Sequence, residues 1–275
     1  MKNKVFSTLK VFGFNDTDDI EIYKKEEEKK QIKKKKPEPV VTGEVDINSL
    51  MYLKNIKCPV CSTEFSCRTV KCRAPRIKSR DSDMFVRYYI INPYLYDVWI
   101  CDLCGYAALK SDFHKIRPKQ IRNIQLKISN NWKKKYFPPI FDEKIAIERY
   151  KLALLNAVLG EFDNSTKAYI CLKIAWMYRI LEKHEEEQEF LKKALEGFLI
   201  AYDKEVMPVY GLDKYSMMYL IGELYRRTGD YENAKLWLGT VITSFAAPQR
   251  VKDKAREMRE EAMLSERCQE ASEGC

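Results

Sequence analysis

Apolar residues in the second half of the chain recur with the period of an α-helix. Tyr150, Leu154 and Ala157 lie on one stripe. A segment with the same period starts after Pro118 and stops near Pro138. The pattern predicts further helices at residues 143–160, 166–182, 185–202, 213–228, 231–245 and 249–270.

The pattern between Asn55 and Tyr106 is different, because short runs rich in Val, Ile, Tyr and Phe replace the helical period. The runs 84–91 and 95–101 are separated by Asn92-Pro93, a pair typical of turns. We therefore expect these runs to form a hairpin in a small antiparallel sheet. The predicted fold class is α+β, with a small antiparallel β module followed by an all-α array of helical hairpins.

Composition sets the domain boundaries that we expect. Residues 1–46 contain the lysine and glutamate run KKEEEKKQIKKKKPEPVV, which is typical of a disordered tail. We predict a β module at 47–117, a helical array at 118–248, and a charged capping helix and tail at 249–275. No segment resembles a signal peptide or a membrane span, which predicts a cytoplasmic protein.

The net charge of +9 is concentrated in the middle of the chain, where residues 47–140 carry +12. A basic module of this kind suits contacts with phosphates, and its tyrosines suit stacking on bases. Nucleic acid is therefore the alternative to a protein as a partner.

Nine cysteines occur in a chain that we expect in a reducing compartment, where metal ligands and free thiols outnumber disulfides. Four of them form two Cys-x-x-Cys pairs, Cys58 with Cys61 and Cys101 with Cys104. Each pair has the spacing of a metal-binding knuckle, and two knuckles make a tetrahedral site for one structural Zn²⁺. The 39 residues between the pairs exceed the roughly 15–20 of compact modules, so a hairpin must bring the pairs together.

The residues after the two pairs differ. Gly105 follows the second pair, where a left-handed backbone is inexpensive and lets amide groups point at the sulfurs. Ser62 follows the first pair and is a poorer match. A redox pair or an iron–sulfur site remains an alternative use of these cysteines. His114 and His184 do not lie at ligand spacing from either pair.

Two further pairs of residues leave their chemistry open. For Cys67 and Cys72 three interpretations are open. They are an alternate metal ligand, a redox-sensitive thiol whose pKa is lowered by basic neighbours, or cysteines without a specific role. For Asp81 and Asp83 two interpretations are open. Their carboxyl groups share one face of a strand and act as acids or metal ligands, or nearby arginines neutralise them in a structural network.

The segment 217–244 resembles a tetratricopeptide repeat. Its small, aromatic, turn and packing positions are filled by Gly222, Tyr225, Gly229, Tyr231, Ala234 and Leu238. The small residues let two antiparallel helices approach closely. A weaker copy lies 47 residues earlier, with Ala175 at the position of Gly222 and Glu187 in place of Ala234.

Arrays of such repeats present a groove to a protein partner. The resemblance implies that eight side chains face this groove, namely Tyr169, Leu172, Trp176, Arg179, Ser216, Tyr219, Glu223 and Arg226. In the alternative interpretation, these side chains only pack against neighbouring helices.

A combination of motifs covers roughly residues 50–245. The motifs are Cys-Pro-x-Cys, Arg80-Asp81-Ser82-Asp83, Asn92-Pro93, Tyr96-Asp97-Val98-Trp99 and Cys-x-x-Cys-Gly-Tyr-Ala. Together they resemble the bacterial family catalogued as domain of unknown function 2225. The resemblance implies a zinc-ribbon-like head and a helical-repeat body, and it brings no established activity. Cys67, Cys72 and the charged N-terminus depart from the family pattern.

These observations favour a zinc-stabilised adaptor that binds a protein partner through its helical array and performs no catalysis. The first alternative is a nucleic-acid-binding protein that uses the basic module. The second is a zinc or redox enzyme, but no glycine-rich phosphate loop, nucleophile elbow or histidine–acid arrangement is visible in the sequence.

Overall fold

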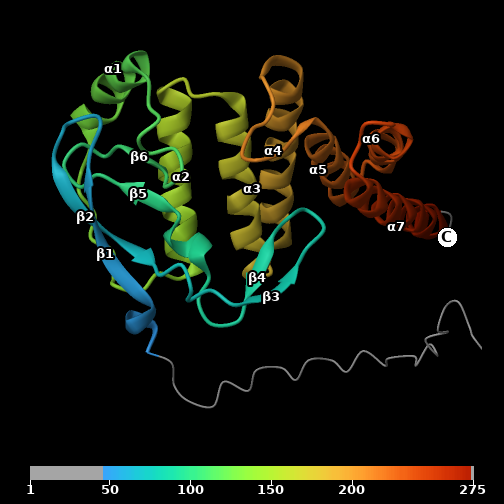
Figure 1. The fold of residues 1–275 in the computed structure, drawn as a ribbon, viewed down its shortest axis with the longest axis horizontal. Helices are drawn as coiled ribbons and strands as arrows, with labels where there is room; N and C mark the ends of the chain where they lie inside the picture. Colours follow the sequence, from blue (N-terminus) through green and yellow to red (C-terminus); the bar gives the residue numbers. More distant parts are fainter. Residues whose placement is uncertain (1–45, 274–275) are drawn as a thin grey trace, which may run out of the picture. The chain divides into compact units, whose positions relative to one another are not determined.

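The computed structural model describes residues 46–273 of the chain (Figure 1). The charged tail expected at 1–46 lies outside the described residues, apart from its last position. Within residues 46–273, strand pairs occupy the first part and seven α-helices follow, so the predicted α+β class is confirmed. None of the described helices is long and apolar enough to cross a membrane.

In the part of the chain that the structure describes, six short strands form three separate two-stranded antiparallel sheets. Each sheet pairs two consecutive strands, and in chain order β1 to β6 are Met51–Lys57, Glu64–Val70, Ile77–Arg80, Val86–Tyr88, Val98–Ile100 and Ala107–Leu109. The β module therefore consists of three local hairpins. The sequence analysis predicted one small antiparallel sheet instead.

The hairpin predicted between residues 84–91 and 95–101 is wrong, because β4 pairs with β3 and β5 pairs with β6. The reason lies at Asn92. Its side chain accepts a hydrogen bond from the Tyr94 amide at 3.0 Å and caps a short 3₁₀ helix, η3, at Pro93–Tyr96. A capped helical turn redirects the chain at a point where a hairpin needs a tight reversal.

The seven helices follow the predicted periodicity closely. In chain order, α1 to α7 are Pro118–Lys127, Glu143–Leu159, Asn164–Ile180, His184–Lys204, Lys214–Arg227, Tyr231–Thr243 and Gln249–Glu273. The main difference concerns α1, which ends at Lys127 and not near Pro138. The residues that follow, Ser129–Asn131, have low helix propensity and form a 3₁₀ turn, η4.

The strands and helices share one hydrophobic core. Phe85, Val98 and Leu109 of the hairpins belong to the same buried cluster as Tyr150 of α2 and Trp176 of α3. Figure 1 shows β5 and β6 on one side of α2 and α3 on the other. The helix α2 therefore joins the hairpins to the helical array.

Two helical hairpins, α3–α4 and α5–α6, turn with the same backbone pattern. Glu182 and Gly229, 47 residues apart, both take a positive φ, +56° and +84°. In each turn the next residue donates its amide to the carbonyl five positions earlier at 3.0 Å. This bond closes the end of the first helix. Glycine adopts the conformation without strain, whereas Glu182 pays a steric penalty.

Gly222 lets α5 and α6 approach closely, since a Cβ built there would lie 2.8 Å from Cγ of Leu238. We expect Gly222→Ala to lower the free energy of unfolding by about 1–2 kcal/mol, because overpacking outweighs the gain in helix propensity. Gly239→Ala is the matched control. Its added methyl group has Arg259 Nε, at 3.9 Å, as nearest neighbour. This variant should gain up to about 1 kcal/mol.

Urea denaturation followed by circular dichroism measures both variants. Equal changes in the two glycine variants would contradict the close approach of α5 and α6 at Gly222.

Candidate metal centre and acidic turn

The two Cys-x-x-Cys pairs occupy the turns of two hairpins. Cys58 and Cys61 lie between β1 and β2, and Cys101 and Cys104 lie between β5 and β6. In each turn the carbonyl of the first cysteine accepts the amide four residues on, and its own amide donates to the carbonyl five residues on, all at 2.9 Å. The same knuckle is therefore built twice by local backbone hydrogen bonds.

The four sulfurs converge, as the sequence predicts. All four Sγ atoms lie within 4.8 Å of one another. The Cys58–Cys104 and Cys61–Cys101 pairs are each 3.6 Å apart, far beyond a disulfide length of about 2.05 Å. Four sulfurs at about 2.3 Å from a central metal ion stand about 3.8 Å apart in a tetrahedron. The cluster therefore has the dimensions of a four-cysteine metal site.

Both residues that follow the knuckles take the left-handed conformation, with φ of +61° at Ser62 and +72° at Gly105. Ser62 thus fulfils the same backbone role as the glycine, at a steric penalty. Gly105 meets a second requirement, because a Cβ built there would lie 2.5 Å from the Trp132 ring. The indole covers the second knuckle, and its Nε1 donates to the Asp102 carbonyl at 2.9 Å.

Hydrogen bonds between the closely spaced thiols shift the pKa values of three of them in opposite directions. Hydrogen bonds with Cys104 and Cys58 lower the pKa of Cys101 to about 2. The hydrogen bond with Cys101 raises the pKa of Cys58 to about 12, and it raises the pKa of Cys104 further, together with Cys58 and burial. A bound cation would stabilise all four in the charged form.

A small core encloses the cluster and consists mainly of Ile56, Trp99, Tyr106, Phe113 and Ile124. From α1, the Gln125 side chain donates to the Val60 carbonyl at 3.1 Å. Ser129 donates to the Cys104 carbonyl at 3.0 Å. Four cysteine ligands in apolar surroundings leave no coordination position for water, which is typical of structural metal sites.

The two histidines lie away from this centre. His114 packs edge-on against Phe113, with ring centroids 5.4 Å apart, and the His184 side chain is exposed beside Glu187. Within residues 46–273, no other group of three or more histidine, cysteine or acidic side chains converges in the same way.

Cys67 does not have the lowered pKa that its basic neighbours suggested. Its side chain is buried, and burial raises the pKa of the thiol to about 11 despite the nearby charge of Arg149. Its neighbour Arg68 lies on the opposite face of β2, because successive side chains of a strand point to opposite faces. Cys72 is exposed after the end of β2. Neither residue belongs to the metal cluster.

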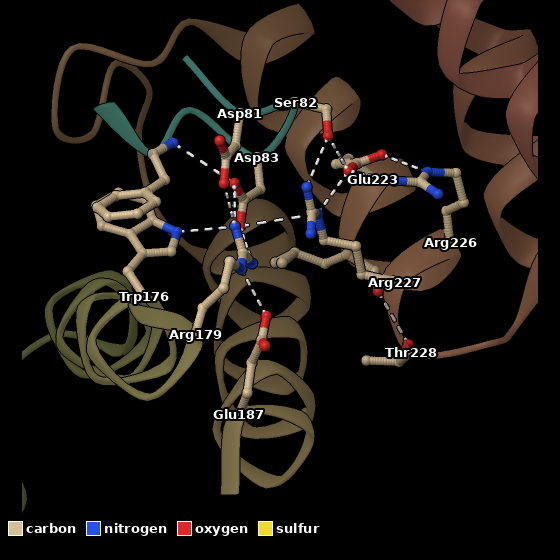
Figure 2. A network of polar contacts seen from close by, with 12 residues as sticks. Asp81, Ser82, Asp83, Trp176, Arg179, Glu187, Glu223, Arg226, Arg227 and Thr228 are labelled. Carbon is tan, nitrogen blue, oxygen red and sulfur yellow. Dashed lines mark hydrogen bonds and ion pairs between the residues drawn. The ribbon is translucent and has the colours of Figure 1, made fainter. Parts of the chain in front are cut away.

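The residues Asp81, Ser82 and Asp83 connect β3 to β4, and we call them the acidic turn. The Asp81 amide donates to the Phe85 carbonyl at 2.8 Å. Met84 takes a φ of +71°, a strained value for a residue other than glycine. Figure 2 shows the turn inserted against α3 and α5. The two aspartates therefore do not share a strand face, and both bind arginines, as the structural-network interpretation predicts.

Arg179 of α3 is the centre of this network. It binds Asp81 at 3.0 Å, Asp83 at 2.6 Å and Glu187 at 2.6 Å (Figure 2). The Asp83 side chain has no exposed area, and Trp176 donates its Nε1 hydrogen to it at 3.0 Å. A fully buried carboxylate requires partners of this kind.

The turn is held from α5 as well. The Tyr219 hydroxyl donates to the Ser82 carbonyl at 2.9 Å, and the Ser82 hydroxyl donates to Glu223 at 2.5 Å. Glu223 is buried and accepts from Arg226 at 2.8 Å and from Arg227 at 2.7 Å. The charges of α5 are therefore satisfied around the acidic turn.

The eight side chains predicted to face a partner groove fall into two sets. Four contact the acidic turn, so the chain itself fills this part of the groove, and they are Trp176, Arg179, Tyr219 and Glu223.

The other four side chains do not touch the turn in this way. Leu172 is buried in the core, Arg226 binds Glu223, and Ser216 is partly exposed in the first turn of α5. Tyr169 stacks on Tyr210 with ring centroids 4.3 Å apart. Contact of these eight positions with a separate partner stays a prediction.

The sequence analysis missed the roles of Arg227 and Glu187. Glu187 stands where the repeat pattern has a small packing residue, and the structure pairs it with Arg179. A charged residue at a packing position was the available signal, because burying it requires an opposite charge nearby.

Asp83 provides a test of the network. Burial alone would raise its pKa, but the hydrogen bonds and charges of Arg179 and the charge of Arg227 outweigh burial, so the pKa is lowered. We expect Asp83→Asn to lower the free energy of unfolding by about 3 kcal/mol, because it leaves buried arginine charge less compensated. Asp253→Asn removes an exposed pair with Arg256 and should change it by less than about 1 kcal/mol.

The same variant should alter the pH dependence. The folded pKa of Asp83 lies below the unfolded value of about 4, so its contribution is complete above that pH and is lost as pH falls through the folded pKa. Urea titrations across this range should give a flatter profile for Asp83→Asn than for the wild type. Parallel profiles would contradict the assignment.

Comparison with known proteins places the chain among relatives of undescribed function. Residues 51–262 match the model of a family described as "Uncharacterized protein conserved in bacteria (DUF2225)". An "Uncharacterized protein" of Borreliella burgdorferi (strain ATCC 35210 / DSM 4680 / CIP 102532 / B31) is 27% identical over 158 residues, which cover 50% of this chain and 56% of the relative. The chain thus spans a little over half of that relative's length.

A comparison with solved structures gives no match. Because the family model covers most of the chain, including both cysteine pairs and the acidic turn, the chain belongs to this bacterial family, DUF2225.

Proposed function

We propose that this chain is a zinc-stabilised, non-catalytic adaptor that binds a protein partner through its helical array. The observation that carries the proposal is a closed four-cysteine cluster in a small core of its own, which packs beside the larger core of an array of helical hairpins through Phe162. The cluster suits a structural ion, and an array of this form suits contact with another protein.

Zinc is the ion that this site suits best. Two Cys-x-x-Cys knuckles offer four soft thiolates in tetrahedral spacing, and Zn²⁺ accepts this geometry without redox chemistry. Binding in such sites contributes roughly 10–16 kcal/mol in apparent terms. The ion would join the β1–β2 hairpin to the β5–β6 hairpin, which belong to different sheets.

Full-length protein purified under reducing conditions should contain about one zinc ion per chain by elemental analysis. Cobalt substitution should give the charge-transfer absorption of four thiolates. Cys58→Ser and Cys104→Ser should lose the metal and expose the β1–β2 hairpin to protease. Cys268→Ser removes an exposed thiol outside the cluster and should leave both unchanged. Wild-type protein that lacks stoichiometric metal yet resists protease would refute the role of zinc.

The surface that best supports a partner is the outer groove between α6 and α7. This groove has a volume of about 880 Å³ and is lined in part by Leu236, Thr240 and Met263. Leu236 is 65% exposed, and Phe245, just beyond α6, is fully exposed. The groove predicted from the repeat resemblance is filled in part by the acidic turn. The buried contacts of this turn oppose its displacement by a partner. The lining residues 236, 240 and 243 recur at helical spacing, which suits an apolar helix of the partner.

The partner surface is tested by affinity capture with the full-length chain, followed by mass spectrometry. Leu236→Glu combined with Phe245→Glu should lose the proteins that the wild type captures, because charges cannot be buried unpaired in an apolar contact. Val206→Glu is the control, since Val206 is 90% exposed and lies outside the groove. If the double variant captures the same proteins as the wild type and the control, the proposal is overturned.

A further inference from the structure

A second cavity lies beside the metal centre and has a volume of about 320 Å³. Its walls come from β2, from the Cys101–Cys104 knuckle through Asp102, and from the segment 132–141 that leads into α2. The cavity lies in the basic part of the chain. Four cationic side chains line it against the single carboxylate of Asp102, namely Arg68, Lys134, Lys135 and Arg149.

Arg149 is the unusual member of this set. It lies in α2, is 8% exposed, and has its guanidinium over the rings of Phe137 at 5.0 Å and Phe141 at 4.5 Å. Its Nη2 donates to the Val98 carbonyl at 2.6 Å. Its Nε is buried without a hydrogen-bond partner among the described residues.

No carboxylate within residues 46–273 forms an ion pair with Arg149. This distinguishes it from Arg179, which is similarly buried and binds three carboxylates. Buried charges in proteins are normally paired, because removing them from water is costly. Desolvation accordingly lowers the pKa of Arg149 to about 10. Both aromatic rings pack against the guanidinium, and Arg149 is among the residues that line the cavity, so an anion in the cavity would lie beside this charge.

The rim of the cavity is also cationic. Lys134 binds Asp102 at 2.9 Å and Lys135 binds Glu148, both as partly exposed pairs. Arg68 has no carboxylate partner in the described part of the chain and only a long hydrogen bond, 3.4 Å, to Asn48. The excess positive charge therefore rests on Arg68 at the rim and Arg149 at the base.

We propose that this cavity binds a nucleotide-sized ligand through its phosphate group, with the N–H edge of Arg149 as the buried contact. Arginine donors match phosphate oxygens in geometry and charge. A phosphate carries enough negative charge to interact with Arg68, Lys134 and Lys135 as well. The indole of Trp132 and the ring of Phe137 line the same cavity and offer apolar walls to a flat base. A volume of this size suits a small molecule.

The proposal is tested by isothermal titration of the full-length, metal-loaded chain with adenosine monophosphate, inorganic phosphate, sulfate and adenosine. Adenosine monophosphate should bind, phosphate should bind more weakly and compete with it, and adenosine should not bind. No binding of adenosine monophosphate at about 1 mM, equal binding of adenosine, or equal binding of sulfate overturns the proposal.

Variants locate the site. Arg149→Gln should weaken the binding of adenosine monophosphate by at least about tenfold. Arg122→Gln, an arginine of α1 that does not line the cavity, should leave it unchanged. Since loss of the Val98 contact can disturb folding, Arg68→Gln at the rim serves as a second variant and should weaken binding about threefold or more.

Unchanged affinity in both cavity variants overturns the assignment. An oligonucleotide that binds in the absence of any mononucleotide binding also overturns it, because the basic surface would then contact a nucleic-acid backbone and the cavity would take no ligand of its own.

Discussion

Four sulfur atoms from two hairpins that share no strand pairing lie within 4.8 Å of one another. Each hairpin is too short to be stable alone, because a two-stranded ribbon buries little surface. Their tips meet at the cysteines, and α1 and η4 close over the contact through Gln125 and Ser129. The geometry of the β module therefore depends on what keeps these sulfurs in place.

The convergence of the knuckles also determines the path of the chain between them. The residues between Cys61 and Cys101 must leave the first hairpin and return to the second, and on the way they form β3, β4 and η3. This segment places Asp81 and Asp83 against the helical array, where both form ion pairs with Arg179. A connection that is long for a compact four-cysteine module thus becomes the link between the module and the helices. The two parts consequently share buried residues such as Phe85 and Trp176.

The sequence predicted those features that depend on local spacing. Cysteine pairs two residues apart and apolar residues at the helical period define knuckles and helices within a few turns of chain. The same locality explains the error at Asn92-Pro93, because this dipeptide suits both a hairpin turn and the cap of a 3₁₀ helix. The end of α1 was missed because the apolar period continues past it, although Ser129–Asn131 have low helix propensity and Trp132 packs over Gly105.

The acidic turn lies beyond prediction from local pattern for a related reason. Asp83 and Arg179 are 96 residues apart, and Ser82 and Glu223 are 141 apart. The sequence contains several arginines and acidic residues that can form ion pairs, and only the packed structure shows which of them do. The four-cysteine cluster could be derived from spacing and soft-ligand chemistry. The neighbouring cavity could not, because its residues come from five separate stretches of the chain.

The distance along the chain between the acidic turn and its partners bears on how the protein is made. A ribosome synthesises the turn long before its partners, so Asp83 meets Arg179 of α3 first, and Ser82 meets Glu223 only after α5 has left the exit tunnel. The knuckles can assemble by then, whereas the inner face of the array is completed only near the end of translation. Such late closure of distant contacts slows folding, and the apolar core residues that α5 covers stay exposed together with the acidic turn in the interval.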